Sequence, residues 1–259
     1  MADSTSPPDE LAPPAAESVL GAYFEQLSRL QESDKSPKEV AVALAQRIGS
    51  RHFLSVLEIM TEMDRLYREM RSVLNEFTGR SSFLVTILTI EHLAAVMKLY
   101  VISWHTMLDL VARSVNAAFD LGIADRDVRL PLLLNNAHVK SSRIPEILQR
   151  YEKARCIKDL GKRRNDAVHR AWIPDPDVDA MLKERNTIDS RRYSLLEASP
   201  ISDDEHNRRL SDLQERLGAL AKNKREMWEK LHAQTIAMTS EVARELAVKT
   251  VELYRKGAI

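Results

Sequence analysis

The chain is poor in the residues that turn a backbone. Its 259 residues include only seven glycines and ten prolines, and four of those prolines fall within the first fourteen residues. This glycine content is well below the roughly 7% of average usage. No glycines cluster as a P-loop or a dinucleotide-binding fold requires, and a β-sandwich or barrel needs more turns than these residues allow. The composition therefore predicts an all-α protein.

Cysteine is almost absent as well. The single cysteine, Cys156, excludes a disulfide framework and favours a reducing, cytoplasmic setting. No basic and apolar signal peptide opens the sequence. The longest apolar stretch, residues 83–104, is interrupted by Glu91, His92 and Lys98, and charges at that depth are costly in lipid. We therefore expect a buried bundle helix there and no membrane partner.

The familiar catalytic and metal-binding patterns are missing too. No two of the seven histidines are four residues apart, and there is no CxxC, so we expect no metal and no other cofactor. There is no Gly-x-Ser-x-Gly elbow. The run Asp203-Asp204-Glu205-His206 could suggest a metal site. Acids are favoured in the first turn of a helix, however, so we interpret the run as a helix start.

Helical patterns are present over most of the chain. Two capping boxes, Ser36-Pro37-Lys38-Glu39 and Ser202-Asp203-Asp204-Glu205, mark helix starts. Residues 177–201 are the hardest to interpret, and we expect a short helix and an extended piece around residues 193–196. The predicted helices cover residues 15–30, 36–49, 52–77, 81–121, 145–154, 157–171 and 202–256. Three points are left open: a break or bend within 81–121, continuity between 145–154 and 157–171, and a break near Gly218.

Apolar positions recur in steps of three and four over residues 52–77, which predicts one buried helical face. These positions are Phe53, Leu54, Leu57, Met60, Met63, Leu66, Tyr67, Met70, Val73 and Leu74. The apolar residues of 202–259 are amphipathic but hold no strict seven-residue repeat. Helices that pack on a body are therefore favoured there over a coiled-coil dimer arm.

We expect five parts along the chain. Residues 1–14, acidic and rich in proline, form a disordered tail. The other parts are N-terminal helices (15–80), a core (81–173), a connecting segment (174–201) and C-terminal helices that pack on the core (202–259).

The net charge of zero conceals an uneven distribution. Residues 1–20 carry four acids and no base, whereas residues 140–170 carry ten Lys or Arg against four Asp or Glu, a net charge of +6. Bulk attraction to nucleic acid is excluded for the whole chain, but a local basic surface is not.

One motif lies inside that basic region. Arg164 is followed by the polar Asn165, three further residues and His169. This resembles the Arg-polar-x3-His motif of the HEPN superfamily, whose all-helical domains include many metal-independent ribonucleases. The resemblance covers about residues 81–172. It implies a HEPN-like up-and-down helical bundle with extra N- and C-terminal helices.

The resemblance also implies a function. It predicts a metal-independent endoribonuclease that acts as a homodimer, with the motifs of two protomers facing each other in one composite site. A toxin–antitoxin or defence setting, with an antitoxin or another protein as partner, is implied in the same way.

The residues themselves suit RNA cleavage by its own 2′-hydroxyl group. An imidazole such as that of His169 can move a proton near neutral pH. The guanidinium of Arg164 can hold phosphate oxygens with two parallel hydrogen bonds. Asn165 lies four residues before His169, on the same helical face, and can orient the imidazole or the phosphate. Arg163 and Asp166 are expected to support the site.

A second polar group precedes the motif. His105, Asp109 and Asn116 fall on one face of an otherwise apolar helix, where buried polar groups need partners. We expect the motif helix to supply those partners. For Asp109 a structural hydrogen bond and a direct catalytic role both remain open. Trp104 and Trp172 are interpreted as core residues.

A different class of function also fits these patterns. The protein would then be a non-catalytic helical module whose basic helix binds RNA or an acidic protein. Cleavage would require His169, whereas binding through charge would survive its loss and weaken with salt.

Overall fold

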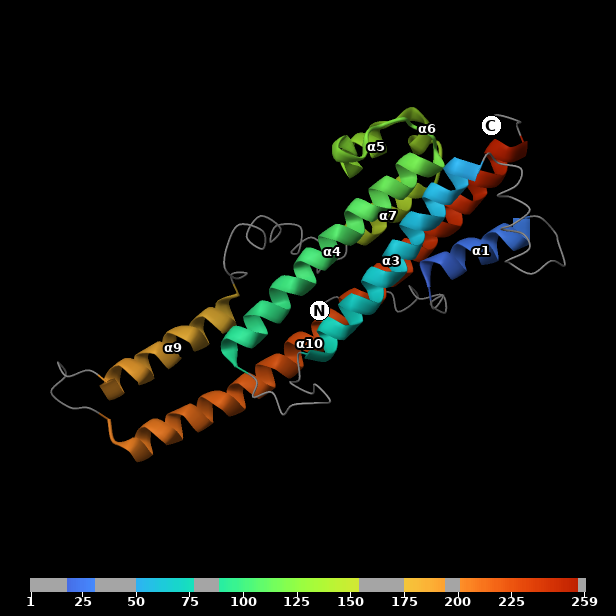
Figure 1. Cartoon of the computed structure of the whole chain (residues 1–259). Coiled ribbons are helices and arrows are strands. Elements are labelled where there is room, and N and C mark those ends of the chain that lie inside the picture. Colours follow the sequence, from blue (N-terminus) through green and yellow to red (C-terminus); the bar gives the residue numbers. More distant parts are fainter. Residues whose placement is uncertain (1–17, 31–49, 77–88, 154–174, 194–200, 256–259) are drawn as a thin grey trace, which may run out of the picture. The chain divides into compact units, whose positions relative to one another are not determined.

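The structure, a computed structural model, describes residues 18–30, 50–76, 89–153, 175–193 and 201–255, and every regular element in these ranges is a helix (Figure 1). The predicted all-α class is confirmed. The expected tail at 1–14 and the expected helices at 36–49 and 157–171 lie outside the described residues. The described α-helices are α1 (Val19–Leu30), α3 (Ser50–Glu76), α4 (Ile90–Ala118), α5 (Leu130–Asn135), α6 (Ala137–Lys140), α7 (Ile144–Glu152), α9 (Pro176–Tyr193) and α10 (Asp203–Arg255), with a short 3-10 helix, η1 (Asp125–Asp127).

The chain forms two compact units, each assembled from separate stretches. Unit 1 takes its described residues from 1–67, 107–154 and 233–259, and unit 2 from 68–106 and 155–232. Helices α3, α4 and α10 contribute residues to both units. Consequently neither unit corresponds to one continuous piece of sequence.

The start of α1 in unit 1 is set by a side chain of α3. The carboxylate of Asp64 accepts hydrogen bonds from the backbone nitrogens of Val19 at 2.7 Å and Leu20 at 3.4 Å, and the Ser18 hydroxyl accepts one from Gly21 at 2.8 Å. The first four N–H groups of a helix have no partner within it. The helix therefore begins where these acceptors lie.

Two tyrosines connect α10 to the other helices of unit 1. The Tyr23 hydroxyl of α1 is hydrogen-bonded to the Thr250 hydroxyl at 2.9 Å, and burial raises the pKa of Tyr23 well above its usual value. On α3, Tyr67 donates to the backbone oxygen of Thr235 at 3.0 Å and is also hydrogen-bonded to the Thr239 hydroxyl. These buried polar groups are satisfied, so α1 and α3 pack on α10 without the penalty of an orphaned hydroxyl.

The same part of α10 holds α7. Arg150 forms an ion pair with Glu241, and the Tyr151 hydroxyl donates to that carboxylate at 2.8 Å. The backbone nitrogen of Arg143, just before α7, donates to Glu245 at 3.0 Å. Burial, and then the hydrogen bond to Glu241, raise the pKa of Tyr151. The end of α7 is thus attached to α10 before the chain enters residues 154–174.

The core of unit 2 is built on an aromatic contact between α4 and α10. The rings of Tyr100 and Trp228 lie 4.5 Å apart at 88°, an edge-to-face arrangement. His232 follows one turn later on α10, 6.4 Å from the Tyr100 ring and 5% exposed. Trp104 is buried at 2% exposure, which confirms its interpretation as a core residue.

The predicted apolar face of α3 is largely confirmed. Phe53, Met60, Met63, Leu66, Tyr67, Met70 and Leu74 are buried, and Leu57 and Val73 are half-buried. Leu54 differs, with 47% of its surface exposed. It shares a helical face with Glu58 and Thr61, four and seven residues later, which are also exposed.

One expectation for the C-terminal half needs correction. Residues 176–193 form one helix, α9, which is longer than the short helix expected there, and residues 194–196 of the expected extended piece lie outside the described residues. Asp175 caps α9 by accepting from the backbone nitrogens of Asp177 and Val178 at 3.2 and 3.3 Å, and Pro176 is its first residue.

The break near Gly218 that the sequence left open is not present. Helix α10 runs without a break from Asp203 to Arg255, because Leu213, Leu217 and Ala221 keep one face buried on both sides of the glycine. The start of α10 agrees with the predicted capping box, since the Ser202 hydroxyl accepts from the Glu205 backbone at 3.2 Å.

Among the described residues, α4 is one helix long and apolar enough to cross a membrane by length and composition. Half of its most apolar window is buried in the structure.

Candidate functional site

The predicted catalytic motif lies outside the described residues. Arg163, Arg164, Asn165, Asp166 and His169 all belong to residues 154–174, so their geometry is not described. The described chain enters that segment at the end of α7 and leaves it at Asp175.

The three polar residues predicted on one face of α4 have different surroundings. In unit 1, Asp109 is exposed, which differs from the expected buried stripe. Asn116, also in unit 1, has found its partner in the following turn: its side chain donates to the backbone oxygen of Ile123 at 2.8 Å and accepts from the Ile123 nitrogen at 3.3 Å. In unit 2, the half-buried His105 packs edge-to-face on Trp104, with 4.9 Å between the rings.

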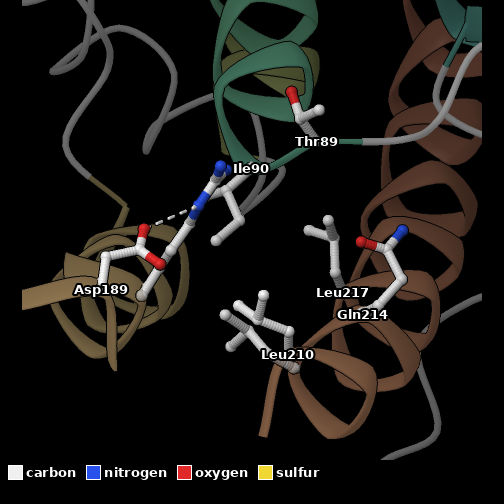
Figure 2. Close-up of a pocket in the computed structure, with 8 residues that line it drawn as sticks. Thr89, Ile90, Asp189, Leu210, Gln214 and Leu217 are labelled. Atoms are coloured by element: carbon white, nitrogen blue, oxygen red, sulfur yellow. Dashed lines mark ion pairs between the residues drawn. The ribbon is translucent and has the colours of Figure 1, made fainter. Parts of the chain in front are cut away.

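A pocket is present in unit 2 where α9 approaches α10 and the start of α4 (Figure 2). Its volume is about 200 Å³. One face of α10 provides an apolar floor, because its leucines recur in steps of three and four. Polar side chains of α9 form the opposite wall. The lining consists of Thr89, Ile90, Arg185, Asp189, Leu210, Leu213, Gln214 and Leu217.

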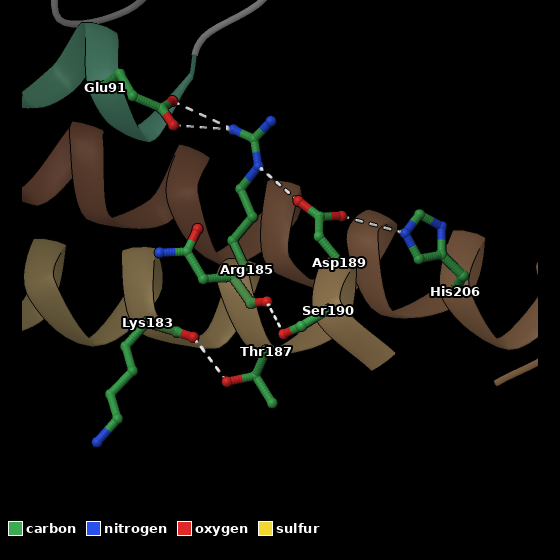
Figure 3. A network of polar contacts seen from close by, with 8 residues as sticks. Glu91, Lys183, Arg185, Thr187, Asp189, Ser190 and His206 are labelled. Atoms are coloured by element: carbon green, nitrogen blue, oxygen red, sulfur yellow. Dashed lines mark hydrogen bonds and ion pairs between the residues drawn. The ribbon is translucent and has the colours of Figure 1, made fainter. Parts of the chain in front are cut away.

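A chain of polar contacts joins α4, α9 and α10 (Figure 3), and two of its residues, Arg185 and Asp189, line the pocket. Arg185 of α9 donates to both carboxylate oxygens of Glu91 on α4, at 3.2 and 3.3 Å, and lies 3.7 Å from Asp189 one turn later. Asp189 in turn lies 3.3 Å from Nε2 of His206 on α10. His206 is buried at 4% exposure. The run Asp203-Asp204-Glu205-His206, which the sequence predicts as a helix start, lies in the first turn of α10. Within it His206 contacts α9, while Glu205 pairs with Arg208 and Arg209 of its own helix.

Further ion pairs continue along α9. Glu184 accepts a hydrogen bond from Arg216 of α10 at 2.9 Å, and this bond raises the pKa of the Arg216 guanidinium. At the start of α9, Lys224 donates to Asp175 at 2.8 Å and to Asp177 at 3.1 Å. Asp175 is 1% exposed, so this pair is buried. In each case the acid belongs to α9 and the base to α10.

Sequence reasoning missed this whole arrangement. The acids and bases that join different helices are 17 to 94 residues apart in the chain, and no local pattern connects them. One available signal was Asp175-Pro176, a capping residue followed by proline, which predicts that a helix starts there.

The described residues contain no group of three or more His, Cys, Asp or Glu side chains that could hold a metal ion. The chain matches no protein-family model, no curated protein and no solved structure with which we compared it.

Proposed function

We propose that the protein is a HEPN-like, metal-independent endoribonuclease. The observation that carries the proposal is the sequence Arg164-Asn165-x3-His169 inside a +6 stretch of an otherwise neutral chain. Supporting it is the all-helical architecture of the described residues, the class of fold in which this motif occurs.

The proposed chemistry uses the substrate's own nucleophile. The 2′-hydroxyl oxygen attacks the adjacent phosphorus, and the bond from phosphorus to the 5′-oxygen breaks. Neutral His169 takes the hydroxyl proton, and the leaving 5′-oxygen receives a proton from water or from a protonated His169 in a second copy. Arg164 stabilises the charge on the phosphorane oxygens. The products carry a 2′,3′-cyclic phosphate and a 5′-hydroxyl group.

The remaining residues have supporting roles in the proposal. Asn165 orients the imidazole or the phosphate, and Arg163 and Asp166 complete the polar setting. Asp109, which is exposed, has one of two roles in the proposal: a structural hydrogen bond to the motif helix or a direct part in the reaction. A homodimer brings two motifs together, so a short motif is sufficient.

The test is cleavage of mixed RNA in EDTA. We expect the wild type to produce 2′,3′-cyclic phosphate ends and both Arg164→Ala and His169→Ala to lose them. Matched controls are Arg126→Ala and His138→Ala, which remove one arginine and one histidine from exposed positions of unit 1. Cleavage that survives in both motif variants would overturn the assignment of the site. Asp109→Asn separates its two roles, since a catalytic carboxylate lowers kcat and a structural one lowers stability.

The second candidate is a helical binding module without catalysis. The observation that favours it is the leucine-lined pocket of unit 2, which lies outside the motif. In this case RNA or protein binding would persist in His169→Ala, and binding to RNA would weaken steeply with salt.

A further inference from the structure

The two halves of α9 are attached to unit 2 in different ways. In the N-terminal half, Val178 and Met181 are buried, and the buried carboxylate of Asp175 is paired with Lys224. In the C-terminal half, Ile188 alone is buried among the side chains that are described. Apolar burial is the main attractive force between helices in water. With two buried apolar side chains against one, the N-terminal half of α9 is therefore attached to unit 2 more strongly than the C-terminal half.

The C-terminal half depends instead on three polar contacts: two ion pairs between solvent-accessible side chains, and one hydrogen bond between Asp189 and the buried imidazole of His206. These are the pairs Glu184–Arg216, Asp189–His206 and Arg185–Glu91. The side chains of Glu184 and Asp189 are 41% and 40% exposed, so salt screens their interactions efficiently.

The pocket lies under the same half of the helix. Arg185 and Asp189 line its wall, and Leu210, Leu213 and Leu217 line its floor (Figure 2). An unfilled space lacks the dispersion contacts that close packing would provide. The charged contacts therefore cover an apolar surface that α9 does not fill.

We propose that residues 184–193 of α9 are an electrostatic latch that opens reversibly and uncovers the leucine-lined pocket of α10, while residues 175–181 remain attached as its anchor. The latch consists of Glu184, Arg185 and Asp189, and its partners are Glu91, His206 and Arg216. Its opening does not depend on the ribonuclease proposal, because none of these residues belongs to the motif.

Opening has a direct readout in amide hydrogen exchange of the full chain. A short helical segment that loses its tertiary contacts is marginal in water, so the released half exchanges quickly. On raising NaCl from about 0.05 M to about 1 M, we expect protection in residues 184–193 to fall roughly tenfold. Protection in residues 178–183, in α1 and in residues 238–251 of α10 should stay within about twofold.

Two variants with the same charge change separate the latch from bulk charge. Glu184→Gln with Asp189→Asn removes two latch carboxylates, whereas Glu58→Gln with Glu152→Gln removes two exposed carboxylates of unit 1. We expect only the first pair to deprotect residues 184–193 at low salt and to increase the fluorescence of the apolar dye ANS, which reports uncovered apolar surface. Exchanging the partners, Glu184→Arg with Arg216→Glu, should restore protection toward the wild-type level.

Any one of three results would overturn the proposal. The first is protection of residues 184–193 that persists in 1 M NaCl, and the second is equal behaviour of the two charge-matched variants. The third is exchange of the whole of α9 together with the core of unit 2. The ANS signal gives an independent check, because opening without an increase in dye binding would mean that the pocket is not uncovered.

Discussion

Individual buried side chains determine how unit 2 responds to acid. Burial, and then the nearby Arg71, lower the pKa of His232 to about 4. The unfolded chain holds its histidine near the ordinary pKa of about 6.5. The folded state therefore prefers the neutral imidazole, and the unfolded state binds the proton first as the pH falls.

The stability that His232 provides is complete above about pH 6.5 and is lost between there and about pH 4. A difference of this size corresponds to about 3 kcal/mol. We expect His232→Leu to reduce the fall in unfolding free energy between pH 7 and pH 4 by about that amount, as measured by urea denaturation at each pH. His138→Leu, at an exposed position, serves as the control. Equal acid sensitivity in wild type and His232→Leu would contradict the prediction.

A second residue-scale prediction concerns Lys224. Its ammonium group pairs with Asp175, a carboxylate that is 1% exposed. Removing one partner of a buried pair leaves a charge without compensation and costs about 3 kcal/mol. We expect Lys224→Met to lower the urea midpoint accordingly, while Lys222→Met, exposed on the same helix, changes little. Equal urea midpoints for the two variants would show that the pair between Lys224 and Asp175 does not contribute to stability.

At the scale of the element, α10 contains a glycine that the helix does not require. Gly218 is exposed, and a Cβ atom added there would meet nothing within 4 Å. Glycine in a helix interior is about 1 kcal/mol less favourable than alanine. We expect Gly218→Ala to raise the unfolding free energy by about that amount in a urea titration. No gain, or a loss, would mean that α10 needs flexibility at this position.

Helices with one continuous apolar face could be predicted from the sequence. Burial in α3 follows steps of three and four, and the capping box at Ser202 identified the start of α10. Helix α9 could not be found in this way, because its buried apolar residues, Val178, Met181 and Ile188, are few and unevenly spaced. Its remaining contacts are ion pairs to distant residues, and no local periodicity encodes them.

The same difference between local patterns and long-range contacts decides which candidate site could be predicted from the sequence. The catalytic motif is a local pattern of residue types, so it could be proposed from the sequence. The pocket of unit 2 required α9 and α10 to be placed side by side, which only tertiary contacts can do. Asn116 illustrates the limit, since its helical face was evident but its hydrogen-bond partner, the backbone of Ile123, was not.

At the scale of the whole molecule, the proposed function makes a prediction about assembly. A composite ribonuclease site needs two chains of 29.5 kDa each. We therefore expect sedimentation equilibrium to give twice that mass, about 59 kDa, at micromolar concentration. A protein that sediments as a monomer and still cleaves RNA would refute the composite site and leave the cleavage chemistry to a single motif.

The interleaving of the two units in the sequence has a consequence for synthesis on the ribosome. The Tyr23 hydroxyl of α1 is hydrogen-bonded to the Thr250 hydroxyl, 227 residues later in the chain. Unit 1 therefore cannot fold vectorially, that is, as an N-terminal domain that is complete before the next part of the chain emerges from the ribosome. The apolar faces of its early helices stay uncovered until residues 233–255 of α10 have been synthesised. During that interval the nascent chain is exposed to aggregation, and a chaperone that binds apolar helices would act on α1 and α3.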